Sequence, residues 1–335
     1  MDYSQIRGFN YQPSYGRNGL ELWRKFNAEA ISRELGRGKE YFPCMNAIRL
    51  WLSWDAFIYA DEAERGEYCD NFATALDIAA DYELRVMPVL FNRWHNEHLD
   101  YGGIYVDHFL PDAWGGAWAG HGFEGFLKRC RSFVDAVVGP HAADERILAW
   151  DLCNEPFSYG NLDDDNIRPL IKSEYAWLKE QHNHCKELGT TSPITVGTHW
   201  GTPLEWVEPI SDILSIHPYW IPGADKKEYE NHLNADLEFA GQVGKPLMST
   251  ETCWGSLNDE ERVDIIRYTL GEHARRDIGW LAYLLHHSLI ADAHRPCFGP
   301  VGPPGNLAFI EADGSLRPGH GILNEYADSA EVDVA

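Results

Sequence analysis

Two glutamates each follow a short apolar run in this sequence. Glu155 comes at the end of one run, in the triplet Asn154-Glu155-Pro156, and Glu251 ends another. Two carboxyl groups about 5–5.5 Å apart can cleave a glycosidic bond by double displacement, one as acid/base and the other as nucleophile. The alternative is that both are solvated loop carboxylates, as most glutamates are. The fold must bring the two together for the catalytic interpretation to hold.

Short apolar runs alternate with longer amphipathic stretches along the chain. Eight runs have the length and composition of strands: 6–11, 46–52, 85–91, 147–153, 193–200, 212–219, 245–251 and 278–285. This alternation predicts an α/β fold, a (β/α)₈ TIM barrel, as one domain over residues 1–335. A doubly wound open sheet is the main alternative, but the first run is not followed by the Gly-rich phosphate turn typical of that fold.

Helical periodicity is expected between the runs. The predicted helices cover 61–82, 166–187, 225–242 and 259–275, with a short one near 203–210. Asn258, with Glu261 three residues on, is typical of a helix N-cap followed by a capping acid. Long segments follow the third and eighth runs, at 92–120 and 286–321, and loops of this length after barrel strands are commonly functional.

The glutamates end the fourth and seventh predicted strands, and the chain around them resembles glycoside hydrolase family 5 within clan A. The resemblance runs from Gly8-Phe9-Asn10-Tyr11 to Asp313-Gly314-Ser315. It implies a retaining mechanism in which Glu155 is the acid/base and Glu251 the nucleophile. The further roles that it implies fall on Arg49 near the nucleophile, Asn154 on the sugar 2-hydroxyl, His217 in the cleft and Tyr219 bonded to Glu251.

The sequence departs from the family pattern at two places. The strand-three histidine has no clean counterpart, and His95, next to Trp94, is the nearest candidate. The strand-eight tryptophan that forms the floor of the −1 sugar site is replaced by Leu285-His286-His287. We therefore expect the floor to be His286 or a loop tryptophan such as Trp254, with Trp94, His95 and His287 as further substrate-binding residues.

Tryptophans are concentrated where a sugar would bind. Seven of the 13 are expected in loops after strand ends, at positions 54, 94, 114, 118, 200, 220 and 254. Pyranose rings stack on indole faces, although such residues can also simply pack long loops. The acidic excess in the same loops fits a neutral sugar and disfavours an acidic one.

A metal-dependent hydrolase is an alternative enzyme class. His286, His287, Asp292 and His294 form a cluster on the last loop, but no second ligand set stands at recognisable spacing. Direct sugar contact is the favoured interpretation, so we expect neither a metal nor another cofactor. The motif at 120–125, G-x-G-x-x-G, follows a loop and not a strand, which disfavours dinucleotide binding. A non-catalytic sugar-binding barrel remains a third hypothesis.

Composition restricts the partners. Lys and Arg number 28 against 52 Asp and Glu, a net charge of −24, which disfavours nucleic acid and anionic membranes. The seven cysteines form no CxxC pair, and the first residues resemble no secretory signal, so a cytoplasmic location is expected. The predicted function is a retaining β-glycosidase acting from chain ends on short neutral oligosaccharides, β-mannosides before β-glucosides. An endo-acting mannanase or glucanase is the alternative.

Overall fold

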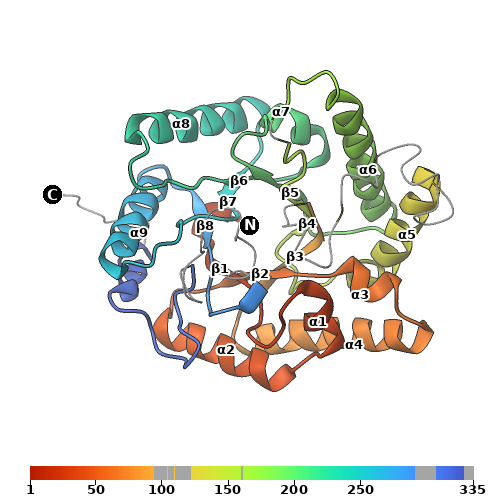
Figure 1. The fold of residues 1–335 in the computed structure, drawn as a ribbon, viewed down its shortest axis with the longest axis horizontal. Helices are drawn as coiled ribbons and strands as arrows, with labels where there is room; N and C mark the ends of the chain where they lie inside the picture. Colours follow the sequence, from red (N-terminus) through yellow and green to blue (C-terminus); the bar gives the residue numbers. More distant parts are fainter. Residues whose placement is uncertain (94–103, 105–108, 110–121, 160, 291–306, 328–335) are drawn as a thin grey trace.

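Eight parallel strands close into a barrel in the order β1 to β8 (Figure 1). The computed structural model describes residues 1–93, 104, 109, 122–159, 161–290 and 307–327. The strands are β1 Arg7–Tyr11, β2 Ala47–Trp51, β3 Arg85–Asn92, β4 Trp150–Asn154, β5 Ile194–His199, β6 Leu214–His217, β7 Leu247–Ser249 and β8 Gly279–Ala282. All eight predicted strands are confirmed, and so is the (β/α)₈ barrel.

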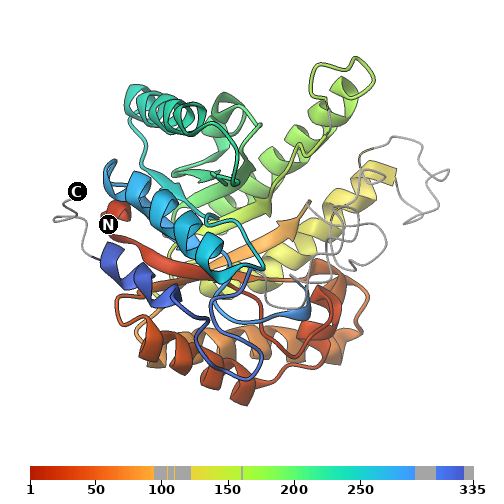
Figure 2. The ribbon, with the colours of Figure 1, turned by 60° about the vertical axis from the view of Figure 1, so that its left-hand side comes forward.

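Helices surround the strands on the outside (Figure 1). They are α1 Gly19–Arg24, α2 Ala28–Tyr41, α3 Trp54–Ile58, α4 Glu62–Asp81, α5 Gly122–Val137, α6 Arg168–Glu187, α7 Leu204–Val207, α8 Lys226–Val243 and α9 Asp259–Ala274. The predicted helices correspond to α4, α6, α7, α8 and α9. As Figure 2 also shows, α5 and α6 lie side by side. Within the described part of the chain, no helix is long and apolar enough to cross a membrane.

The predicted cap of α9 is present. The side-chain oxygen of Asn258 accepts a hydrogen bond from the Glu261 amide at 3.0 Å, which satisfies one of the orphan donors at the helix start. The reciprocal bond of a full capping box is found at α4 instead, between Asp61 and Glu64.

The interior of the barrel is layered. One layer is an apolar cluster of Ile6, Ala47, Met87, Leu148, Ala149, Ile213, Met248 and Leu281. Residues two apart on a strand point to the same side, so Arg49 follows Ala47 and Thr250 follows Met248 toward the carboxyl ends of their strands. An apolar layer therefore closes the barrel below a polar layer. The larger apolar core, which includes Phe72, Trp150 and Trp177, lies between strands and helices.

The close packing of β1 on β2 gives a test of the fold. A Cβ at Gly8 would lie 2.0 Å from the carbonyl oxygen of Ala47, a backbone atom that cannot move aside. We expect Gly8→Ala to lower the free energy of unfolding by about 3 kcal/mol or more, measured by urea denaturation.

Gly66, on the exposed face of α4, is the matched control because nothing lies within 4 Å of a Cβ there. Gly66→Ala should raise the free energy of unfolding by about 0.5–1 kcal/mol, because alanine favours the helix. Equal stabilities of the two variants would contradict the described register.

Candidate active site

The fold brings Glu155, at the end of β4, and Glu251, just after β7, into one cluster. One oxygen of each carboxylate and a ring nitrogen of His217 all lie within 4.8 Å of one another. Both glutamates are buried, with 5% and 6% of their surface exposed. This upper limit on the spacing lies near the about 5–5.5 Å of retaining glycosidases and well below the about 6.5–9.5 Å of inverting ones.

Arg49 joins the site from β2 and is fully buried. Its Nη1 donates to Glu251 at 2.6 Å and to Asn10 at 2.9 Å. Its Nε and Nη2 donate to the same Asp151 oxygen at 2.9 and 2.7 Å, and Nη2 also donates to Asn154 at 2.8 Å. These bonds use all five N–H groups of the guanidinium.

The charge of Arg49 is secure despite its burial. Burial lowers the pKa of Arg49, but the carboxylates of Asp151 and Glu251 outweigh that effect and hold the pKa above its usual range. A permanent cation therefore stands 2.6 Å from one oxygen of Glu251.

The second oxygen of Glu251 is bonded to Tyr219, which donates its hydroxyl proton at 2.7 Å. Burial, followed by the negative charge of Glu251, raises the pKa of Tyr219 well above its usual value, so the phenol stays protonated. The indole of Trp254 packs edge-on against the Tyr219 ring, with centroids 5.3 Å apart. Arg49 and Tyr219 thus fix both oxygens of Glu251.

His217 lies between the two glutamates. Its Nδ1 is 2.8 Å from Glu155 and 3.7 Å from Glu251, and its Nε2 is 3.0 Å from the hydroxyl of Thr250. Burial lowers the pKa of His217 to about 4, and the charge of Glu251 only partly opposes this effect. The ring is therefore neutral near pH 7. If Thr250 donates to Nε2, the proton is on Nδ1 and is donated to Glu155.

Asn154 is held by two polar contacts beside the acid/base candidate. Its oxygen accepts from Arg49 at 2.8 Å, and its Nδ2 donates to Asn92 at 3.1 Å. These bonds set the orientation of the amide, which is 1% exposed.

The turn that carries Glu155 has an uncommon backbone. Glu155 has a φ of 47° and Phe157 a φ of 61°, both in the left-handed region. Such conformations cost about 1–3 kcal/mol each in non-glycine residues and persist only where the surroundings fix them. The Glu155 amide donates to the Gly197 carbonyl at 2.8 Å, and the Ser158 hydroxyl donates to the Glu155 carbonyl at 2.6 Å.

Several residues of the polar layer were not identified from the sequence. They are Asn10, Asn92, Asp151, Gly197 and Thr250. Asp151 stands within an apolar run, as Arg49 does, and a charged residue in such a place is a signal that could have found it. Gly197 leaves the space for the network, because a Cβ there would lie 2.9 Å from polar atoms of Arg49, Asp151 and His217. Only the assembled site reveals that requirement.

His286 and His287 follow β8 but lie in a different setting from the one expected. The Nε2 of His286 is 3.3 Å from Arg37 of α2, and its Nδ1 is 3.1 Å from the His287 carbonyl oxygen. Both rings are buried. His286 therefore faces α2, and the structure does not show it as a floor beneath Glu155 and Glu251. Trp94 and His95 lie outside the described residues.

The alternative metal cluster is not assembled in the described part of the chain. Asp292 and His294 lie outside it, and the group there with suitable ligand spacing is Glu155, His217 and Glu251. Cys153 and Cys253, each two residues from a glutamate, are fully buried. Burial raises the pKa of both thiols, which suits packing residues.

The tryptophan prediction holds only in part. Trp54 is 1% exposed and packs on Phe126, because α3 begins directly after β2 and turns this residue inward. Trp200 packs against Tyr229 of α8, and Trp220 packs against Tyr268 of α9. Three others, at 94, 114 and 118, lie outside the described residues. Among the loop tryptophans that the structure describes, Trp254 packs against Tyr219 of the site.

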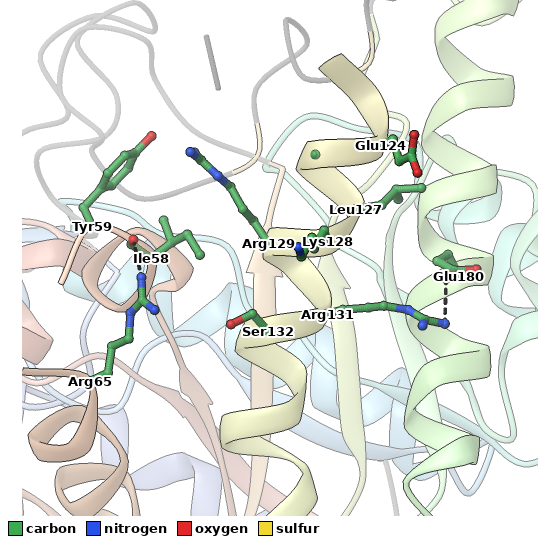
Figure 3. Close-up of a pocket in the computed structure, with 11 residues that line it drawn as sticks. Ile58, Tyr59, Arg65, Glu124, Leu127, Lys128, Arg129, Arg131, Ser132 and Glu180 are labelled. Atoms are coloured by element: carbon green, nitrogen blue, oxygen red, sulfur yellow. Dashed lines mark hydrogen bonds and ion pairs between the residues drawn. The ribbon is translucent and has the colours of Figure 1, made fainter. Parts of the chain in front are cut away.

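A cavity of about 880 Å³ lies outside the barrel near α3, α4, α5 and α6 (Figure 3). Arg65 donates to the backbone carbonyls of Phe57 and Ile58, and Arg131 pairs with Glu180. Glu124 and Glu180 are the acidic residues among its described lining. A smaller cavity of about 500 Å³ adjoins the Glu155 turn and is lined by Phe157, Ser158, Tyr159, Asn161, Leu162, His199, Gly201 and Thr202.

Known structures share this fold. No protein-family model matches the sequence, and no curated protein is significantly similar in sequence. GH5_18 from Streptomyces cattleya in complex with GlcNAc superposes with a TM-score of 0.74 at 13% identity, covering 97% of this chain and 80% of its own.

A mannosidase and a mannanase are also similar in structure. Exo-β-1,4-mannosidase Op5Man5 from Opitutaceae bacterium strain TAV5 has a TM-score of 0.71 at 16% identity, over 96% of this chain and 59% of its own. The endo-β-1,4-mannanase from Thermotoga petrophila has a TM-score of 0.65 at 16% identity, over 98% of this chain and 77% of its own. The chain thus shares the TIM-barrel fold of these structures; identities this low show the fold alone.

The low pKa of His217 predicts how stability depends on pH. An unfolded histidine titrates near pH 6.5 and the folded one near 4, so the unfolded state binds the proton first as pH falls. This contribution to stability is complete above pH 6.5 and is lost between pH 6.5 and 4. It amounts to about 3 kcal/mol for the fully buried ring.

His217→Asn keeps a donor to Glu155 and cannot be protonated. We expect the fall in unfolding free energy between pH 7 and pH 4.5 to be about 2–3 kcal/mol smaller in this variant than in the wild type, measured by urea denaturation at both pH values. An equal fall in the two proteins would rule out a buried neutral His217.

Proposed function

We propose that this protein is a retaining β-glycosidase. The observation that supports the proposal is the buried pair Glu155 and Glu251, with carboxylate oxygens within 4.8 Å and neutral His217 between them. In the first step Glu251 attacks the anomeric carbon while Glu155 protonates the leaving oxygen. In the second step Glu155 takes a proton from water, the water oxygen bonds to the anomeric carbon, and Glu251 leaves.

The contacts support different roles for the two glutamates. Both oxygens of Glu251 are bonded, one to the cation of Arg49 and one to the phenol of Tyr219, which favours a charged nucleophile. Glu155 is hydrogen-bonded to the neutral ring of His217 at 2.8 Å, a setting compatible with loss and gain of a proton. The family resemblance assigns the same roles. We also assign Asn154 to the sugar 2-hydroxyl and Trp254 to the wall of the sugar site.

The proposed substrates are short neutral β-linked oligosaccharides cleaved from one end, β-mannosides before β-glucosides. Similarity in fold to an exo-β-1,4-mannosidase supports exo action, as do the long segments that follow β3 and β8. The endo-β-1,4-mannanase is a neighbour of lower TM-score and represents the alternative. The acidic surface favours an uncharged sugar.

Substitution of each glutamate should separate the two steps on a panel of alkyl and p-nitrophenyl glycosides. We expect Glu251→Gln to lower kcat at least about 10³-fold on every substrate, because no covalent intermediate forms. Glu155→Ala should lower kcat/KM about 10²–10⁴-fold on alkyl glycosides. The fall in kcat/KM should be much smaller on activated aryl glycosides, whose leaving groups need little protonation. Added azide should restore turnover to this variant by attacking the glycosyl-enzyme and should yield the β-glycosyl azide.

Two controls distinguish this mechanism from others. Glu272→Gln changes a buried, ion-paired glutamate of α9 in the same way, and its rates should match the wild type. Dialysis against a chelator should leave the rates unchanged, whereas inactivation that zinc or manganese reverses would favour a metal held by Glu155, His217 and Glu251. Wild-type rates in both glutamate variants would contradict the proposal.

The products that appear first distinguish exo action from endo action. On linear β-1,4-mannan oligosaccharides of five or six units, exo action should release monosaccharide from the first minutes and shorten the chain one unit at a time. Chromatography of early time points measures this, with reducing-end labelled substrate to identify the attacked end. Early release of mid-length fragments would instead support the endo alternative.

A further inference from the structure

A second buried carboxylate stands behind the turn that carries Glu155. Glu174 of α6 is fully buried, and its Oε1 accepts from the Nε of Arg93 at 2.9 Å and from the Phe157 amide at 3.0 Å. Arg93 follows β3 and is itself 5% exposed; its amide donates to the Asn154 carbonyl at 2.9 Å. One oxygen of Glu174 therefore connects α6, the end of β3 and the turn after β4.

The turn needs such support. Glu155 and Phe157 both have left-handed φ values, which non-glycine residues rarely adopt. Such a turn persists where its surroundings determine it. Gly197 and Ser158 bond the backbone of Glu155, whereas the amide of Phe157 is bonded to Glu174. The support on the Phe157 side thus comes from a charged side chain on a long helix.

Charge, burial and a ring contact favour a fixed geometry for the Arg93–Glu174 ion pair. Burial lowers the pKa of Arg93, but Glu174 outweighs this effect and keeps the guanidinium charged. The guanidinium also lies over the ring of Tyr159, 5.3 Å from its centroid. Loss of either charge would leave the other buried without its partner, which is costly in a dry interior.

We propose that the Arg93–Glu174 ion pair is a positioning device for Glu155: through the Phe157 amide it holds the turn in the conformation that aims the Glu155 carboxyl group at the leaving oxygen. This inference rests on the proposed acid/base role of Glu155. Glu174 and Arg93 contact no reacting atom. Their effect is therefore expected in the step that needs proton transfer, and it grows as the leaving group becomes poorer.

The test compares leaving groups in Glu174→Gln, which keeps the side-chain volume and removes the charge. We expect kcat/KM on an alkyl β-glycoside to fall about 10-fold or more, while kcat/KM on the matching 2,4-dinitrophenyl glycoside falls less than about threefold. Glu272→Gln is the control, because it removes a buried ion pair at the far end of α9. It should affect both substrates equally.

An equal loss on both substrates in Glu174→Gln, or no loss on either, would overturn the proposal. If the wild type hydrolyses no glycoside of the panel, the proposed function fails. A measurement independent of activity then tests whether the ion pair holds the turn.

Hydrogen–deuterium exchange supplies that measurement. Glu174→Ala removes the acceptor of the Phe157 amide, so exchange in a peptide spanning 153–159 should become faster than in the wild type at equal overall stability. Glu272→Ala should leave this peptide unchanged. Unchanged exchange in Glu174→Ala would show that the ion pair does not hold the turn.

Discussion

The candidate site depends on one buried cation. The guanidinium of Arg49 is fully enclosed, and its five N–H groups are shared among Glu251, Asp151, Asn10 and Asn154. These partners belong to β1, to β4 and to the segment that follows β7, so one side chain fixes strands that are distant in sequence. Removal of one member of a buried ion pair costs about 3–5 kcal/mol, because the remaining charge has no partner. The side chains around Arg49 must therefore offer hydrogen-bond acceptors to its guanidinium.

The closed barrel makes such a network possible. Residues of alternate strands point inward at the same height, so polar groups from distant segments meet in one layer, with apolar residues closing the space below. The same geometry demands a small residue where the network is densest, which is the place of Gly197 on β5. Burial then sets the chemistry: it keeps His217 neutral and Tyr219 protonated, while ion pairing keeps Arg49 charged.

Much of this arrangement could be predicted, and the errors have identifiable causes. Glu155 and Glu251 stood out because carboxylates ended apolar runs, and Arg49 because it matches the arginine of the family that the sequence resembles. Trp54 was misjudged because a helix starts where a loop was expected. The role of His286 in the sugar site stays a prediction; its ring nitrogen lies 3.3 Å from Arg37 of α2. Position after a strand gives the end of the barrel and does not give the direction of a side chain.

The sequence by itself determined the order of strands and helices, the closure implied by eight repeats, and the two glutamates at the ends of their strands, because periodicity and interrupted apolar runs are local signals. Tertiary structure alone decided which polar side chains converge, how the turn at Glu155 is held, and which groups keep their protons. Those properties depend on distances of a few ångströms between segments separated by tens to hundreds of residues, and on the exclusion of water when the barrel closes.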